Sequence, residues 1–280
     1  MAARYRGVPG IVWLLGVDYY REYWTTYDPM MRAFVEGLRN GGDTHPVTVQ
    51  LGTPSTSSDS PGLRDIVDLE AVYTYRPTYA EVLTAYARDA GPTILIEANF
   101  EGENNEGGPP TTNATLRRQT LWTLTSGGVG ATYGNRQVWQ FADGWQRARD
   151  TTAVKEMQVE FDLFDSIEWW RLVPDARGAF LVSGRGADVT TGTENGGFAD
   201  VLESDRATAA ISPDGTLAVV YVPTARTIGI DRSRLAASVS AWWVDPTTGS
   251  RREAAISDRF TTPGTNAAGA ADWILLFGPA

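Results

Sequence analysis

Several residue types that often carry chemistry are scarce in this sequence. Its 280 residues include no cysteine and one histidine, His45. The lack of cysteine excludes disulfides and thiolate metal sites. With a single histidine, a Ser-His-Asp triad or a His-rich metal site is excluded unless His45 itself serves. His45 lies just before a predicted strand, which is more typical of a polar loop or capping residue.

Basic clusters and long apolar runs are also absent. The formal net charge is −10, which argues against nucleic acid and anionic membranes as main partners. No stretch approaches the roughly 18 to 20 apolar residues of a membrane span. The short apolar run at 11–17 is interpreted as a buried strand rather than a signal peptide. A neutral partner such as a sugar fits this composition better, and ten Trp and eleven Tyr could stack on sugar rings. Taken singly, each aromatic residue is more often part of the core.

The first half of the chain alternates short apolar runs with helical patterns. Strands are predicted at 11–17, 46–52, 68–75, 92–97 and 128–133, and helices at 28–40, 77–91, 114–127 and 150–167. Asp28 and Pro29 should cap and open the first helix. Segments 53–62 and 101–113 are loops by composition. This order predicts parallel βα units, whose chemistry lies at the carboxyl ends of the strands.

The second half has a different pattern. From about residue 176 we predict short strands separated by turn residues, and no helix. Such a pattern favours an antiparallel β-sandwich. We therefore expect two domains, at 1–172 and 173–280.

Two carboxylates stand at predicted strand ends. Asp18 follows the run at 11–17, and Glu97 ends the strand at 92–97. Glycosidases need two carboxyl groups that flank the glycosidic bond. Asp18 could instead cap a turn, and Glu97 could pair with an arginine. Glu101, Glu103 and Glu106 follow on a loop, mostly as surface charges. Glu101 could bind a sugar hydroxyl, and a calcium site on this loop is a weaker alternative.

Five stretches together resemble one known family. VPGIVWLLGVDYY resembles its strand ending in Gly-Gly-Asp, and PTILIEANFEGE resembles its strand ending in Glu. LRRQTLWTLTSGGVGATYGNRQVWQF is the most specific match, and IEWWRLVPD and DWILLFG resemble the junction and end of an accessory sandwich. The family is that of the apiosidase-like glycoside hydrolases. Its members have a (β/α)₈ barrel, often followed by a β-sandwich that has been labelled collagen-binding.

The resemblance implies roles for individual residues. Asp18 matches the acid/base after the fourth barrel strand, and Glu97 matches the nucleophile after the seventh, so we expect a retaining mechanism without metal or cofactor. Residues expected to bind the sugar are Tyr19, Gln50, Tyr75, Asn99, Glu101, Tyr133, Asn135 and Trp139.

The sequence departs from the family pattern in three ways. Val17 stands where a second glycine is usual, and Phe100 replaces a frequent tyrosine. The third departure is that the predicted strands match only strands four to eight of the barrel. The expected fold class is thus a partial TIM-type α/β barrel followed by an all-β antiparallel sandwich. Because an open apolar edge is unfavourable, we expect another polypeptide or a second copy to supply strands one to three, unless the sequence belongs to a longer chain.

The expected function is hydrolysis of furanosides or related sugars in plant or cell-wall polysaccharide, outside the cell or on a cell or virion surface. The alternative is a non-catalytic carbohydrate-binding or structural component of a surface assembly such as a phage tail. A cavity that joins Asp18 and Glu97 would favour the enzyme.

Overall fold

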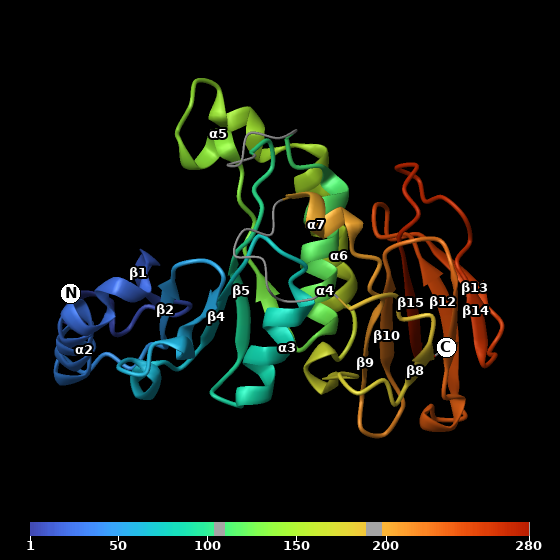
Figure 1. Cartoon of the computed structure of the whole chain (residues 1–280), viewed down its shortest axis with the longest axis horizontal. Coiled ribbons are helices and arrows are strands. Elements are labelled where there is room, and N and C mark those ends of the chain that lie inside the picture. Colours follow the sequence, from blue (N-terminus) through green and yellow to red (C-terminus); the bar gives the residue numbers. More distant parts are fainter. Residues whose placement is uncertain (104–109, 189–197, 280) are drawn as a thin grey trace.

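The computed structural model describes residues 1–103, 110–188 and 198–279. Parallel strands and helices occupy one end and the middle of the chain, and antiparallel strands form the other end (Figure 1). None of the described helices is long and apolar enough to cross a membrane.

All five strands predicted in the first half are present. They are β1 (Trp13–Tyr19), β2 (Val47–Leu51), β4 (Glu70–Tyr73), β5 (Thr93–Glu97) and β6 (Gly128–Ala131). β1 pairs parallel with β2, and β5 pairs parallel with both β4 and β6. Thr48 bridges β2 to the chain before β4 by donating to the carbonyl of Leu69 at 2.5 Å. The five strands therefore follow one another in chain order, and their carboxyl ends share one edge.

The outer edge of β1 is apolar and open. In the described part of the chain, β1 pairs with β2 alone. Leu14 on β1 and Val12 just before it keep 41% and 46% of their surface exposed, and Met30 on α2 keeps 66%.

The four predicted helices are also present, as α2 (Trp24–Asn40), α3 (Tyr79–Arg88), α4 (Asn113–Thr125) and α6 (Thr152–Asp165). The predicted start of α2 was wrong. The helix begins a turn earlier, so Pro29 lies inside it and Asp28 is not its cap. Asp28 is buried, and its carboxylate accepts hydrogen bonds from the hydroxyls of Tyr19 at 2.8 Å and Ser60 at 2.9 Å. Helices α1 (Ala2–Tyr5) and α5 (Arg136–Trp139) are single turns.

The segment at 53–62 is more ordered than its composition predicts. Ser55–Thr56 form the short strand β3, antiparallel to β4, and a 3₁₀ turn at Ser57–Asp59 follows. Thr56 and Asp59 form a capping box there, which explains why a polar segment adopts a fixed structure.

The second half forms the predicted antiparallel sandwich. One sheet has the order β13-β12-β15-β10-β9-β7 and the other β14-β11-β8. The strands are β7 (Val173–Pro174), β8 (Leu181–Ser183), β9 (Thr208–Ile211), β10 (Ala218–Val222), β11 (Thr227–Ile230), β12 (Val239–Val244), β13 (Arg251–Ala254), β14 (Arg259–Thr261) and β15 (Trp273–Pro279). The absence of helix was a wrong prediction, since α7 (Phe198–Glu203) lies in this half. The predicted strands also omitted β13 and β14, whose arginine-rich sequences carry little apolar alternation.

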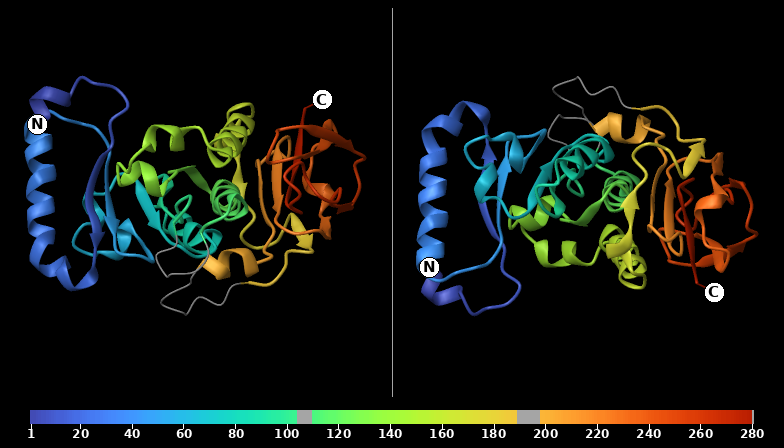
Figure 2. Two further views of the ribbon diagram at one scale, coloured as in Figure 1. Left: turned by 90° about the horizontal axis from the view of Figure 1, so that it is seen from above. Right: turned by 90° about the horizontal axis from the view of Figure 1, so that it is seen from below.

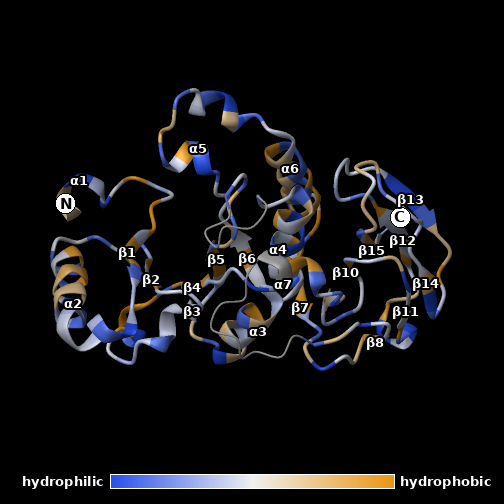
Figure 3. Ribbon diagram, turned by 45° about the horizontal axis from the view of Figure 1, so that its top comes forward, coloured by the Kyte–Doolittle hydropathy of each residue, from blue (hydrophilic) through white to orange (hydrophobic). Residues whose placement is uncertain are grey.

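The larger sheet of the sandwich packs on α4 and α6. Its outward residues, among them Val219 and Leu276, join Trp122 and Phe164 in one buried cluster. Figure 2 shows the sandwich beside these helices, at the far end from α2. Hydrophobic residues are prominent on α2, β5 and α6 (Figure 3).

A buried ion cluster also crosses this contact. Arg117 on α4 donates to both oxygens of Asp272, at 3.0 and 3.1 Å, and to Glu156 on α6 at 2.6 Å. Separating the sandwich from the helices would leave these buried charges without their partners, which is unfavourable. The cluster therefore holds the sandwich against α4 and α6.

Candidate active site

A cavity of about 620 Å³ lies at the carboxyl ends of the parallel strands. It is lined by Val17, Asp18, Tyr20, Thr53, Tyr73, Tyr75, Glu97, Phe100, Glu103, Trp139 and Gln140. The two carboxylates singled out from the sequence therefore face one cavity. They reach it from strand ends that are far apart in the chain.

Glu97, the last residue of β5, is held by hydrogen bonds to both carboxylate oxygens. Tyr75 donates its hydroxyl to Oε1 at 3.0 Å, and Gln50 donates its amide to Oε2 at 2.7 Å. No ion pair to Glu97 occurs among the described residues, so the alternative that it pairs with an arginine is wrong. Two donors on opposite oxygens fix the plane of this carboxylate.

Burial raises the pKa of Glu97 above its usual value. Hydrogen bonds from Tyr75, Gln50 and Tyr73 have the opposite effect and lower this pKa. The negative charge of Asp18 raises it. Burial also raises the pKa values of Tyr73 and Tyr75, and the charges of Glu97 and Asp18 raise them further. Asp18 is therefore close enough to Glu97 for its charge to act on the ionisation of Glu97.

Tyr73 and Tyr75 form a relay behind Glu97. Their hydroxyl oxygens are 2.8 Å apart, and their rings meet edge to face with centroids 5.4 Å apart. Since Tyr75 gives its proton to Glu97, its oxygen is free to accept from Tyr73, which also lies close enough to Glu97 to lower the pKa of that carboxyl. Asn99 supports the relay by donating to the backbone carbonyl of Tyr75 at 3.2 Å.

Asp18 lies at the end of β1 on an unusual stretch of backbone. Gly16, Val17 and Asp18 have φ values of 86°, 89° and 50°, all in the left-handed region. The pairing of β1 with β2 breaks between Gly16 and Tyr19. A Cβ on Gly16 would lie 2.6 Å from the carbonyl oxygen of Gln50, so only glycine fits there. Asp18 is exposed and has no side-chain hydrogen bond within the described residues.

An aromatic rim covers the cavity opposite β1. Trp139 on α5 is 52% exposed and donates its indole N–H to Glu103 at 2.8 Å. The ring of Phe100 lies against Gly134, where any Cβ would approach it to 2.0 Å. Glu103, assigned from sequence to the loop surface, thus orients a rim tryptophan.

The other predicted sugar contacts differ in position. Of the eight, Tyr75 and Trp139 line the cavity, whereas Gln50 and Asn99 are buried behind its wall. Tyr19 points away from the cavity because its hydroxyl donates to Asp28.

Glu101, Tyr133 and Asn135 form a separate network outside the cavity lining. Glu101 Oε2 accepts from the Tyr133 hydroxyl, from the Asn135 amide at 2.8 Å and from Thr151 at 2.8 Å. This network ties the loops after β5 and β6 to the start of α6. Glu106 lies outside the described residues, which contain no group of three or more His, Asp or Glu able to hold a metal.

Residues 1–171 match the family model described as the apiosidase-like catalytic domain. The chain belongs to the apiosidase-like family. Residues 199–278 match the model described as a putative collagen-binding domain of a collagenase. No curated protein matches the sequence.

Solved structures resemble the whole apiosidase-like chain. One is a glycoside hydrolase family 5 protein from Bacteroides vulgatus ATCC 8482, with 20% identity and a TM-score of 0.79. Another is described as a glycoside hydrolase, with 19% identity and a TM-score of 0.80. At these identities the likeness concerns the fold. The apiosidase-like chain is covered completely but spans 64% of the first structure and 67% of the second.

Sequence reasoning missed several residues of the cavity. Tyr73 could have been found, because it shares a strand face with Tyr75 by the period of two. Tyr20, Thr53 and Gln140 lie on turns, where no periodicity indicates direction. His45 belongs to a loop as predicted, with its ring nitrogens 2.8 Å from Asp43 and 2.7 Å from the carbonyl of Val8.

Proposed function

We propose that this apiosidase-like chain hydrolyses glycosidic bonds with Asp18 and Glu97 as its carboxylate pair. The observation that carries the proposal is that one cavity is lined by both groups, while Tyr75 and Gln50 orient Glu97. An apolar and aromatic rim beside polar groups is what a sugar-binding cavity requires.

In this proposal Glu97 is the nucleophile and Asp18 the acid/base of a retaining reaction. Glu97 attacks the anomeric carbon while Asp18 gives its proton to the departing oxygen. Asp18 then takes a proton from water, and that water releases the sugar from Glu97. The fixed plane of Glu97 suits attack, and the exposure of Asp18 suits proton exchange with solvent.

The proposed substrates are furanosides or related sugars in plant or cell-wall polysaccharide. Support comes from the family and from the cavity, whose volume falls within the range of about 300–1,000 Å³ typical of small-ligand sites. Trp139 could stack on a sugar ring at the rim. A polymeric substrate of this kind is met outside the cell or on its surface, where we place the protein.

We also propose that further strands complete a barrel against β1. The unpaired edge of β1 and the exposed apolar side chains of Leu14 on it and Val12 before it favour such a covering. The strands could come from another polypeptide, a second copy or a further stretch of the same polypeptide. Native mass spectrometry of the isolated protein distinguishes these sources.

The direct test of the proposed function is Glu97→Gln, assayed with the completed barrel on a panel of arabino- and apiofuranosides. We expect sugar release to disappear, because the amide cannot attack the anomeric carbon. Glu253→Gln, on exposed β13, is the matched control and should act like the unaltered chain. Equal hydrolysis by Glu97→Gln would overturn the assignment. Sugar binding without any hydrolysis by the unaltered protein would favour the binding-only alternative.

A further inference from the structure

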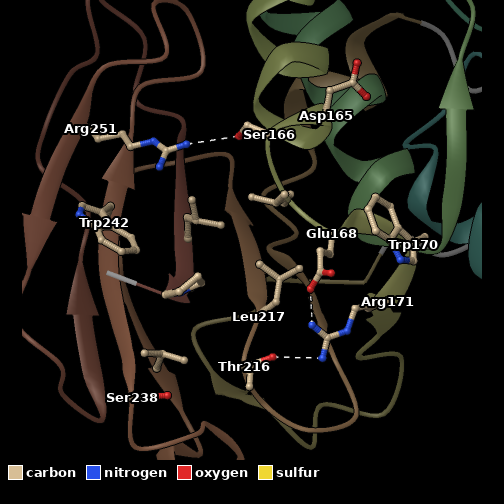
Figure 4. Close-up of a pocket in the computed structure, with 15 residues that line it drawn as sticks. Asp165, Ser166, Glu168, Trp170, Arg171, Thr216, Leu217, Ser238, Trp242 and Arg251 are labelled. Atoms are coloured by element: carbon tan, nitrogen blue, oxygen red, sulfur yellow. Dashed lines mark hydrogen bonds and ion pairs between the residues drawn. The ribbon is translucent and has the colours of Figure 1, made fainter.

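A second cavity, of about 570 Å³, lies between the larger sheet of the sandwich and the segment that follows α6 (Figure 4). It shares no lining residue with the cavity that contains Asp18 and Glu97. Neither the carboxylate pair nor the barrel strands account for it. This cavity is therefore separate from the proposed active site and has no part in the proposed reaction.

Two tryptophans face this cavity from opposite walls (Figure 4). Trp242 lies on β12 and is half-buried, whereas Trp170 lies on the segment after α6 and is 65% exposed. Leu217, Val239 and Leu276 from the sheet supply an apolar floor. An indole left this exposed beside an apolar floor offers a flat surface to a ligand.

Polar groups with unused hydrogen-bonding capacity surround the tryptophans. Within the described residues, the side chains of Asp165 and Ser238 have no hydrogen bond. Arg251 has one long contact, at 3.4 Å to the hydroxyl of Ser166. Both hydrogen-bond donors and hydrogen-bond acceptors therefore remain available around the apolar floor of the cavity.

The charges along the cavity nearly cancel. Arg171 is held by Glu168 and Asp214, each at 2.5 Å, and so is already neutralised. Asp165 and Arg251 both line the cavity and carry opposite charges. With a net charge of −10 for the whole chain, an acidic ligand is disfavoured. A neutral ligand rich in hydroxyl groups fits this lining.

We propose that this cavity is a second glycan-binding site, which holds a short neutral segment of a polysaccharide. Trp170 and Trp242 stack on sugar rings, and Asp165, Ser238 and Arg251 bond to hydroxyl groups. The choice of a glycan rests in part on the proposed hydrolase function. Retention of a polymer here would raise its local concentration at the carboxylate cavity.

A proline-rich peptide is the main competing ligand, since such peptides also dock on aromatic surfaces. The sandwich matches a model named for collagen binding. The unpaired Asp165, Ser238 and Arg251 side chains favour the glycan, because a proline-rich peptide offers few groups to bond with them.

Affinity electrophoresis of the full chain tests the site, in gels that contain arabinan, arabinogalactan, mixed-linkage β-glucan or gelatin. We expect at least one polysaccharide to retard the chain. Trp170→Ala should weaken this binding about tenfold or more, as loss of a central aromatic contact does. Arg251→Gln, on an exposed strand, should weaken it less. Tyr27→Ala removes an aromatic side chain of 44% exposure on α2 and should leave binding unchanged.

Three outcomes would overturn the glycan site: no retardation by any polysaccharide, retardation indifferent to both Trp170→Ala and Arg251→Gln, or retardation by gelatin alone. Circular dichroism establishes that each variant is folded. The same binding should persist in Glu97→Gln, and Trp170→Ala should leave hydrolysis of a small aryl glycoside unchanged. If the unaltered chain hydrolyses nothing but still shows Trp170-dependent retardation, the proposed hydrolase fails and the glycan site stands.

Discussion

The ends of β1 and β5 present one carboxylate each to the same cavity, and they do so in opposite ways. At the end of β5, Glu97 is half-buried and both of its oxygens accept hydrogen bonds. At the end of β1, Asp18 is exposed and lacks a side-chain partner in the described chain. Its backbone, by contrast, is confined to the left-handed region. One carboxylate is fixed through its side chain and the other through its main chain.

This difference is compatible with the two roles that we propose for Asp18 and Glu97. A nucleophile has to keep one orientation, which the donors Tyr75 and Gln50 impose on Glu97. A group that first gives and then takes a proton needs access to water, which Asp18 has. Burial raises the pKa of Glu97 and the nearby charge of Asp18 raises it further, whereas the hydrogen bonds from Tyr75 and Gln50 favour its ionised form.

The largest effect is expected when the carboxylate at the end of β1 alone is neutralised. We expect Asp18→Asn to lower kcat/KM for glycosides with alkoxide leaving groups by about 10²–10⁴-fold, the usual value of general acid catalysis. Formation of the glycosyl–enzyme from aryl glycosides with good leaving groups should be almost unchanged, because they depart without protonation. Pre-steady-state release of the phenol measures this step. If good and poor leaving groups suffer equally, Asp18 is not the acid.

A smaller effect is expected when one of the two hydrogen bonds to the Glu97 carboxylate is removed. Tyr75→Phe removes the donor to Oε1, and charge-assisted hydrogen bonds contribute about 1.5–3 kcal/mol. This bond lowers the pKa of Glu97, so its loss should raise that pKa. Since Glu97 has to be ionised to attack, the acidic limb of the profile of kcat/KM against pH should move to higher pH.

Tyr73→Phe is the matched control for this change. The hydrogen bond of Tyr73 lowers the pKa of Glu97 less than that of Tyr75 does, so the acidic limb should move less. A larger shift for Tyr73→Phe than for Tyr75→Phe would contradict the relay described above.

Much of the fold could be predicted because the spacing of apolar residues along the chain shows which side of a strand or helix is buried. The five parallel strands and four long helices have runs or faces that must be buried, and all are present. The start of α2 could not be predicted, because the buried carboxylate of Asp28 serves Tyr19 and Ser60 instead of a helix end. These partners are distant in the chain, and local patterns do not indicate them.

The candidate site was predictable in its two carboxylates but less so around them. A charged residue that ends an apolar run must lie at the sheet edge, which placed both Asp18 and Glu97. Tyr19 was assigned to the cavity because it follows Asp18, yet the break in pairing after Gly16 turns its ring toward α2. Side-chain direction at a strand end depends on such backbone irregularities, which periodicity does not encode.

The smallest predicted effect concerns the strained end of β1. A β-branched residue at the φ of 89° found for Val17 carries strain of about 1–2 kcal/mol. Val17→Gly relieves that strain but adds about 0.5–1 kcal/mol of backbone entropy cost. We therefore expect urea denaturation to show a gain in stability of up to about 1.5 kcal/mol. Val12→Gly, an exposed valine that lacks the positive φ, should instead reduce stability by that entropy cost. If both substitutions destabilise alike, the backbone at Val17 is not strained, and the main chain does not hold Asp18 as inferred.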